Sequence, residues 1–149
     1  MGYRVAVLMG SPNDRSKMEP AEKLLREFGV EADVLVMSAH RTPDVVAGFA
    51  RTAREEGFSA VICGAGMAAH LAGAVAANTT LPVIGVPLSG GSIGGIDALY
   101  STVQMPRGIP VATVAVDGAM NAALLAIQII AVTDASMAER LAAHRASMG

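Results

Sequence analysis

The chain has 149 residues, a length that predicts one domain over 1–149. Hydrophobic residues make up 52% of it, charged residues make up 16%, and the mean hydropathy is +0.47, which excludes a disordered chain. The formal net charge of −2 gives no electrostatic basis for binding nucleic acid.

Short β-rich runs alternate along the chain with segments of helical periodicity. Five strands are predicted, over residues 3–9, 30–37, 59–63, 82–86 and 110–116. Helices are predicted between and after them, over residues 14–28, 43–57, 67–78, 96–104, 119–132 and 134–147. Thr42 is the expected cap of the second helix, with Pro43 at its first position, and Asp134 is expected to open the last helix.

This alternation predicts a parallel sheet, because parallel strands need a crossover connection that is usually a helix. The strands show no polar alternation, which indicates a sheet covered on both faces. The expected fold is therefore α/β: a three-layer αβα sandwich around a doubly wound, five-stranded parallel sheet, flavodoxin-like in architecture. In this class ligands bind at the carboxyl ends of the strands, so the loops that follow the strands are the places to look for a site.

The loop after the first strand contains Gly10, Ser11, Asn13 and Asp14. Ser11 and Asn13 offer hydrogen bonds, and the start of the following helix offers free N–H groups to an anion. Asp14 would repel a phosphate but would accept hydrogen bonds from ribose hydroxyls. Taken alone, such a loop is more commonly explained by ordinary capping of the helix by Ser11, Asn13 or Asp14.

The loop after the second strand contains Ser38, Ala39, His40 and Arg41. The Arg41 guanidinium suits a phosphate, and His40 is the residue type best matched to proton transfer near neutral pH. The alternative is a surface histidine beside a solvated arginine. The position at the carboxyl end of a strand favours the functional interpretation.

The loop after the third strand holds Gly64, Ala65 and Gly66, followed by His70 and Leu71. It has the form of a G-x-G-x-x-G/A dinucleotide fingerprint but lacks the acidic residue expected about 20 positions later. The glycines would let a ligand approach the backbone closely. On spacing alone, His70 is equally explained as a hydrogen-bonded core histidine.

The uncharged half of the chain is a further feature. Between Gly57 and Thr133 the charged residues are Asp97, Arg107 and Asp117, so this half is expected to face other protein, with Arg107 at a subunit contact. Prolines and glycines interrupt its apolar runs, so no membrane span is predicted. The start of the chain shows no signal peptide, and the single cysteine, Cys63, suits a reducing cytoplasm.

Several chemistries lack their motifs. The three histidines have no metal-ligand spacing and one cysteine builds no zinc site. The chain has neither a phosphate-binding G-x-x-x-x-G-K-[ST] loop nor a G-x-S-x-G nucleophile elbow. We therefore expect no metal and no cofactor.

Taken together, these loops resemble one family, the PurE-type enzymes of purine biosynthesis. The similarity runs from the first strand to about Val132, and its motifs are Met9-Gly10-Ser11 with Asp14, Ser38-Ala39-His40-Arg41-Thr42-Pro43, Gly64-Ala65-Gly66 with Ala68-Ala69-His70-Leu71, the run 82–87, the run 97–110 and the run 121–125. The resemblance implies an N5-carboxyaminoimidazole ribonucleotide mutase activity, which moves a carboxyl group from the exocyclic nitrogen to C4 of an aminoimidazole ribonucleotide. It also implies a small ribonucleotide substrate, no metal or other cofactor, and assembly as a homo-octamer.

The resemblance also implies roles for the loop residues. His40 is the expected general acid and base, Asp14 the ribose contact, and Arg41 with Ser38 the anchor for phosphate and carboxylate. The remaining expected substrate-binding positions are Ser11, Asn13, Ala39, Gly64, Ala65, Gly66, His70 and Leu71. Four positions depart from the usual family pattern: Asn13 replaces a serine, Arg15 a tryptophan, Met67 a glycine and Ala72 a proline.

Three other functions are compatible with parts of the pattern. A sister branch of the family carboxylates aminoimidazole ribonucleotide with free carbon dioxide in the same kind of pocket. A flavodoxin-like module that binds nucleotide or flavin without catalysis is a second alternative, although only Tyr3 and Tyr100 could stack on a flavin as tyrosine or tryptophan. A purely structural subunit is a third, in which the histidine loops are coincidental.

Overall fold

A computed structural model describes residues 2–149. Its strands are β1 (Arg4–Met9), β2 (Glu31–Val36), β3 (Ala60–Gly66), β4 (Val83–Leu88) and β5 (Ala112–Thr113). Its helices are the 3-10 turn η1 (Pro12–Asp14), α1 (Arg15–Glu27), α2 (Pro43–Thr52), α3 (Leu71–Ala76), α4 (Ile96–Val103), α5 (Ala119–Ala131) and α6 (Ala135–Ala146). In this described part of the chain, no helix is both long and apolar enough to cross a bilayer.

The strands form one parallel sheet in the order β2-β1-β3-β4-β5. The chain runs from β1 to β2 on one side and then crosses back to β3 on the other side of β1, so the strand order reverses there, as in the flavodoxin-like doubly wound fold. This confirms the predicted α/β architecture. The reversal also places the loops after β1 and β3 next to each other at the carboxyl edge of the sheet.

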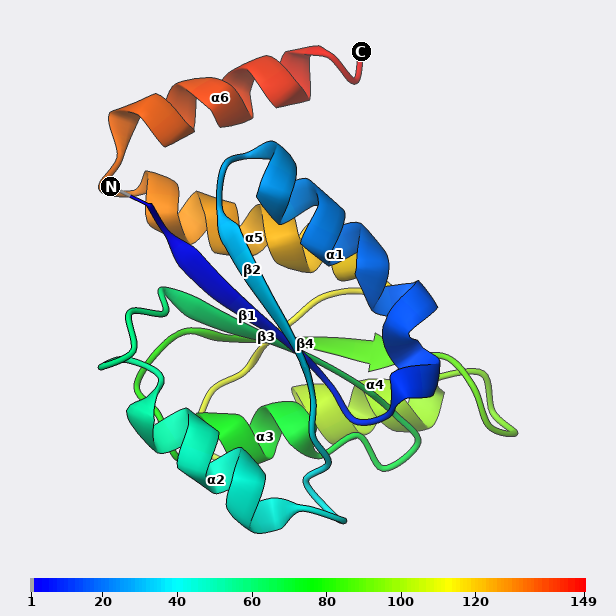
Figure 1. Cartoon of the computed structure of the whole chain (residues 1–149). Coiled ribbons are helices and arrows are strands. Elements are labelled where there is room, and N and C mark those ends of the chain that lie inside the picture. Colours follow the sequence, from blue (N-terminus) through cyan, green and yellow to red (C-terminus); the bar gives the residue numbers. More distant parts are fainter. Residues whose placement is uncertain (1) are drawn as a thin grey trace.

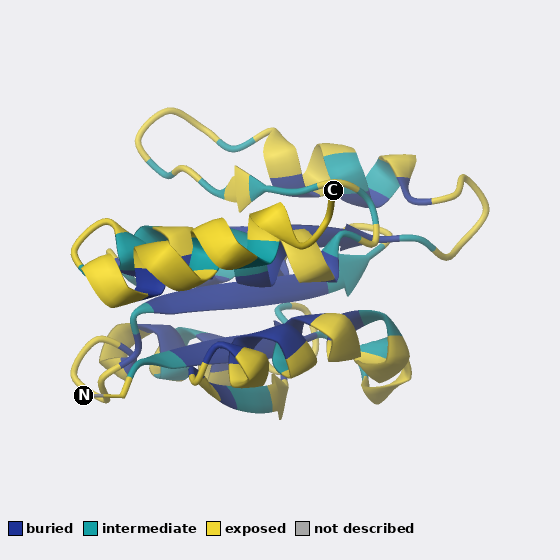
Figure 2. Ribbon diagram, turned by 90° about the horizontal axis from the view of Figure 1, so that it is seen from above, coloured by how far each residue is buried: buried dark blue, intermediate teal, exposed yellow. Residues whose placement is uncertain are grey.

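Helices cover both faces of the sheet (Figure 1). One core joins α1 and α5 to one face and includes Met18, Leu25 and Ile127, all fully buried. The other core joins α2 and α3 to the opposite face through Val46 and Val75. Figure 2 shows the buried strands between helices whose outer faces are exposed. Burial on both sides explains why the strands lack polar alternation.

The end of β3 and the helix that follows it differ from the prediction. β3 does not end at Cys63 but continues to Gly66, because its pairing with β4 runs on to Gly66 opposite Leu88. The predicted helix over 67–78 is reduced to α3. Met67 has a φ of 52°, in the left-handed region that a right-handed helix excludes, so the helix starts only at Leu71.

Two other elements were also predicted to be longer than they are. α2 ends at Thr52 rather than Gly57, because the next residues form a turn in which the Phe58 amide donates to the Ala53 carbonyl (3.1 Å) and Gly57 has a φ of 90°. β5 has only two residues instead of seven, and its register with β4 covers Ala112 and Thr113 alone. β5 is an edge strand that follows Pro110, which has no N–H to donate to the ladder.

Candidate active site

The candidate site residues lie in loops that meet at one edge of the sheet. Because all five strands are parallel, the loops after β1, β2, β3 and β4 leave the sheet at its carboxyl edge. In Figure 1 these loops gather toward the lower right, away from the amino terminus. The sheet therefore brings together residues that are far apart in the sequence.

The turn between β2 and α2 is wound tightly around Ser38. The Ser38 amide donates to the Thr42 hydroxyl, which donates in turn to the Ser38 carbonyl, both at 3.0 Å. The Arg41 amide donates to the Ser38 hydroxyl at 3.1 Å. Thr42 therefore does not cap α2 with its side chain, as was expected, because its hydroxyl is engaged with Ser38. These bonds fix the turn and leave His40 and Arg41 exposed.

His40 and His70 face each other across the site. Their ring centroids are 6.0 Å apart and their planes differ by 6°. His70 is the residue that precedes α3, and both histidines are exposed. The structure therefore does not place His70 in the core, which was its alternative explanation. Two imidazoles at this separation leave no room for a ring between them, but both can exchange protons with a group that lies beside them.

The loop after β1 combines a cap with an available carboxylate. The Ser11 hydroxyl accepts from the Asn13 amide at 3.2 Å, so Ser11 caps η1. Asp14 occupies the cap position of α1, but its side chain makes no capping hydrogen bond with residues 2–149. Burial raises the pKa of the Asp14 carboxyl, against the lowering effect of the Lys17 ammonium and a backbone hydrogen bond of Ser11. Asp14 is therefore a carboxylate that a ligand can engage.

The end of β3 presents backbone rather than side chains. The Gly10 amide donates to the Gly64 carbonyl at 3.2 Å and joins this strand to the loop after β1. A Cβ at Gly66 would lie 3.5 Å from the Leu88 carbonyl, an ordinary van der Waals contact, so a ligand meets bare backbone here because glycine has no side chain. Ala39 and Ala65 pack against the core, and Leu71 is a core member that is 2% exposed. The side chain of Leu71 thus belongs to the core, and only its backbone faces this end of the strand.

Three polar residues beside this site, Lys17, Ser89 and Asp117, were given no role from the sequence, although the loops that contain Ser89 and Asp117 follow predicted strands. Lys17 on α1 donates to the Ser89 carbonyl and hydroxyl, and Ser89 donates to Asp117. Lys17 stands one turn after Asp14, and Asp117 lies in the connection from β5 to α5. Their positions at the carboxyl edge of the sheet could have marked them as candidate site residues. Nothing in the sequence, however, indicates that the three side chains meet.

The described side chains form neither a cluster suited to a metal ion nor a reactive thiol. Over residues 2–149, no group of three or more His, Cys, Asp or Glu side chains is placed to hold a metal ion. Cys63 is buried, and burial raises the pKa of its thiol well above the ordinary value. Such a thiol is not a nucleophile at neutral pH. The chemistry of the site therefore rests on its imidazoles, its carboxylate and its backbone amides.

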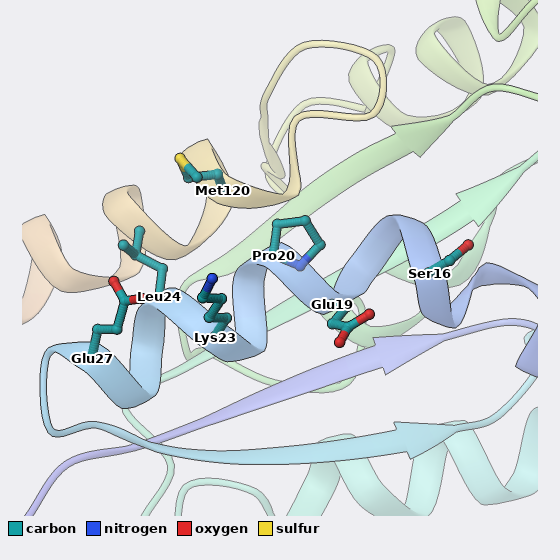
Figure 3. Close-up of a pocket in the computed structure, with 7 residues that line it drawn as sticks. All are labelled: Ser16, Glu19, Pro20, Lys23, Leu24, Glu27 and Met120. Atoms are coloured by element: carbon teal, nitrogen blue, oxygen red, sulfur yellow. The ribbon is translucent and has the colours of Figure 1, made fainter. Parts of the chain in front are cut away.

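An open groove between α1 and α5 is a separate feature (Figure 3). It has a volume of about 420 Å³ and is lined by Ser16, Glu19, Pro20, Lys23, Leu24, Glu27 and Met120. None of the candidate site residues lines it. Its charges are those of a solvated helix face and no histidine lines it, so it is not the candidate active site.

Comparisons with known proteins give consistent results. A family model described as AIR carboxylase matches residues 4–149. Proteins named N5-carboxyaminoimidazole ribonucleotide mutase are similar to the chain. That of Aquifex aeolicus is 53% identical, with 92% of this chain and 82% of the relative covered, and that of Escherichia coli K12 is 51% identical, with 93% and 83% covered. A phosphoribosylaminoimidazole carboxylase of Schizosaccharomyces pombe is 52% identical over 89% of this chain, which spans only 24% of that protein.

The fold is similar to solved structures. The crystal structure of Treponema denticola PurE2-S38D has a TM-score of 0.87 and 31% identity, and covers 99% of this chain and 91% of its own. The structure of Treponema denticola PurE has a TM-score of 0.86 with the same identity and coverage. The similarity thus extends over almost the entire chain.

Proposed function

The chain belongs to the AIR carboxylase family, and from this premise we propose that it is an N5-carboxyaminoimidazole ribonucleotide mutase. It moves a carboxyl group from the exocyclic nitrogen to C4 of the aminoimidazole ring, a step of purine biosynthesis, and acts as a single domain over 1–149. The observation that carries the proposal is the parallel placement of His40 and His70, 6.0 Å apart, at the carboxyl edge of the sheet. A proton-transfer group and a planar surface then lie together beside backbone that a ligand can approach.

The reaction needs one proton to be given and one to be taken. Protonation of the carbamate nitrogen breaks the N–C bond, its electron pair stays on nitrogen, and carbon dioxide is released. C4 then attacks the carbon dioxide, forming a C–C bond, and C4 loses its proton to restore aromaticity. His40 donates the first proton and accepts the second, so no proton is gained or lost overall.

The remaining site residues bind the ribonucleotide and confine the released carbon dioxide. Arg41, exposed beside His40, pairs with the phosphate, and Ser38 and Asn13 add hydrogen bonds to it. Asp14 accepts from the ribose hydroxyls. The backbone at Gly64 and Gly66, with His70, holds the imidazole and keeps the released carbon dioxide beside C4, which turns recapture into an intramolecular event.

Replacement of His40 by asparagine tests this assignment. The variant keeps a side chain of similar reach that hydrogen-bonds but does not exchange protons. We expect it to bind ribonucleotide and to lose about 100-fold or more in kcat, the usual contribution of general acid–base catalysis. Isothermal titration with product and a spectroscopic turnover assay measure the two properties. Near-normal turnover would show that another group transfers the proton.

The carboxylase branch is the second candidate, since one relative carries that name. Incubation with each ribonucleotide separates the two activities. A mutase forms product from the carbamate isomer and does not require added bicarbonate. Turnover of aminoimidazole ribonucleotide with bicarbonate, and none of the carbamate isomer, would establish the carboxylase. A yellow protein with neither activity would point to a flavin-binding module.

We also propose that the protein is a cytoplasmic homo-octamer. Ile96, Tyr100 and Val103 lie on one face of α4 and are 54%, 63% and 45% exposed. This apolar face lies within the uncharged half of the chain, and a second copy of the chain would cover it. Light scattering should give the mass of eight chains, whereas a mass of 15.1 kDa at micromolar concentration would contradict the assembly.

A further inference from the structure

Lys17, Ser89 and Asp117 form a hydrogen-bonded network that joins three separate parts of the fold. The Lys17 ammonium donates to the Ser89 carbonyl and, at 3.1 Å, to the Ser89 hydroxyl. The Ser89 amide donates to one carboxylate oxygen of Asp117 at 2.8 Å, and the Ser89 hydroxyl donates to the other at 2.5 Å. Ser89 is thus held on one side by a cation from α1 and on the other by an anion that follows β5.

Asp117 is itself held in an unusual conformation. Its φ is 60°, in the left-handed region, and its amide donates to the Pro87 carbonyl at 2.8 Å. Burial raises the pKa of its carboxyl, but the Ser89 hydrogen bonds and the Lys17 ammonium outweigh this and hold the pKa below the ordinary value. The Asp117 carboxylate is therefore ionised at neutral pH, and its negative charge balances the positive charge of the Lys17 ammonium.

Ser89 is the first residue of a glycine-rich segment, 89–95, that extends beside the candidate site. Residues 90–94 are exposed, and Gly90, Gly91, Gly94 and Gly95 all have positive φ. Around Gly90 and Gly94 an added Cβ would meet nothing within 4 Å, so these positions make little packing. The segment is placed chiefly by its two ends, of which the Ser89 end is fixed by the network.

The segment also reaches the loop that carries one of the site histidines. A Cβ at Gly91 would lie 3.4 Å from Met67 Cγ, and Met67 belongs to the loop between β3 and α3 that ends at His70. Lys17 lies one turn after Asp14, whose pKa its charge influences. The network thus has one end beside the carboxylate of the site and the other at the base of a segment that touches the histidine loop.

We propose that Lys17, Ser89 and Asp117 act as positioning residues that hold the glycine-rich segment 89–95 against the active site, so that it contributes to ribonucleotide binding. This proposal rests on the proposed carboxyl transfer, because binding is measured through that substrate. The three residues act through the segment, and none of them transfers a proton in the reaction. Their effect is therefore expected on KM rather than on kcat.

Two variants separate the hydrogen bonds from the backbone conformation. Asp117→Gly tolerates the positive φ but removes both bonds to Ser89, whereas Asp117→Asn tolerates it and keeps the shape but removes the charge and one of the two acceptor oxygens. Lys17→Met removes the opposite side of the network. Lys23→Met is the matched control, because Lys23 lies on the same helix and is exposed.

Hydrogen exchange by mass spectrometry and steady-state kinetics are measured on the full chain. We expect faster exchange in peptides covering 88–96 for Asp117→Gly and Lys17→Met, and a rise in KM of about tenfold with kcat within about twofold. Asp117→Asn should fall between these variants and the unchanged protein, and Lys23→Met should change neither readout. Since both network variants act through Ser89, their combination should cost about as much as the worse single change.

Some results would overturn the proposal. Unchanged exchange over 88–96 in both network variants would show that the network does not position the segment. Faster exchange with an unchanged KM would show that the segment plays no part in binding. Should a variant unfold, Ser89→Ala gives a milder test, because it removes the hydroxyl and keeps the amide. A protein that turns over neither ribonucleotide refutes the proposed function, while the exchange data still decide whether the network holds the segment.

Discussion

Replacing Gly64 with alanine is expected to force a buried side chain of the core out of its place. Gly64 stands near the end of β3, and an added Cβ would lie 2.3 Å from Met18 Sδ, 2.8 Å from its Cε and 3.1 Å from its Cγ. Met18 is fully buried on α1, beside Lys17. The substitution therefore couples the core directly to the helix that borders the site.

The magnitude follows from these distances. Non-bonded heavy atoms normally approach to about 3.5–4.0 Å, so Met18 has to move by more than 1 Å. Such overpacking costs about 1–3 kcal/mol, and the flexible thioether of methionine keeps the cost from rising further. The φ of Gly64 is not positive, so alanine restores about 0.4–1 kcal/mol by restricting the unfolded chain. The net loss in the free energy of unfolding is thus about 1.3 kcal/mol, the difference between the midpoints of these two ranges.

Urea unfolding of four variants tests this reasoning. Gly48→Ala is the control, since Gly48 lies in α2, an added Cβ there meets nothing within 4 Å, and alanine should stabilise by about 0.5–1 kcal/mol. Met18→Ala alone should cost about 2–5 kcal/mol because it leaves a cavity. In that background Gly64→Ala should cost nothing, since the clash is gone. An equal cost of Gly64→Ala in both backgrounds would refute the steric explanation.

Three further predictions concern other positions. Gly85→Ala should destabilise more than Gly64→Ala in the same urea experiment, because the added Cβ would lie 2.3 Å from Cγ2 of Thr102, a stiff β-branched side chain; an equal or smaller cost would contradict this. Met67→Gly should raise the melting temperature through relief of a φ of 52°, worth about 1–2 kcal/mol, and a lower melting temperature would mean that the methionine side chain contributes more than the strain costs. The backbone amide of the third residue of α6 and the Tyr3 hydroxyl hold the pKa of Asp134 below its ordinary value of 3.8. The stabilisation from the Asp134 carboxylate is therefore present above pH 3.8 and is lost as the pH falls through the lowered pKa. The melting temperatures of the protein and of Asp134→Ala should consequently converge in acid. A difference in melting temperature that stays constant with pH would contradict this linkage.

The sequence by itself determined the class of fold and the order of the elements. Apolar runs that alternate with amphipathic segments predict a parallel sheet with helices on both faces. The strand centres were predicted correctly because burial on both faces gives continuous apolar runs. Loop chemistry also indicated His40, Arg41 and Asp14, because polar residues directly after buried strands lie at the carboxyl edge. Asp134 was recognised as a cap, and its side chain accepts from the Met137 amide at 3.0 Å.

Tertiary structure decided the boundaries, and with them the contacts of the site. The extension of β3 through Gly66 depends on pairing with β4, a partner that no local pattern of β3 specifies. The approach of His70 to His40 depends on the loops after β2 and β3, which meet because both strands pair in parallel with β1 and so end at the same edge of the sheet. The meeting of Lys17 with Ser89 likewise needs the sheet order, since local spacing fixes which residues share a face of one element but not which elements become neighbours.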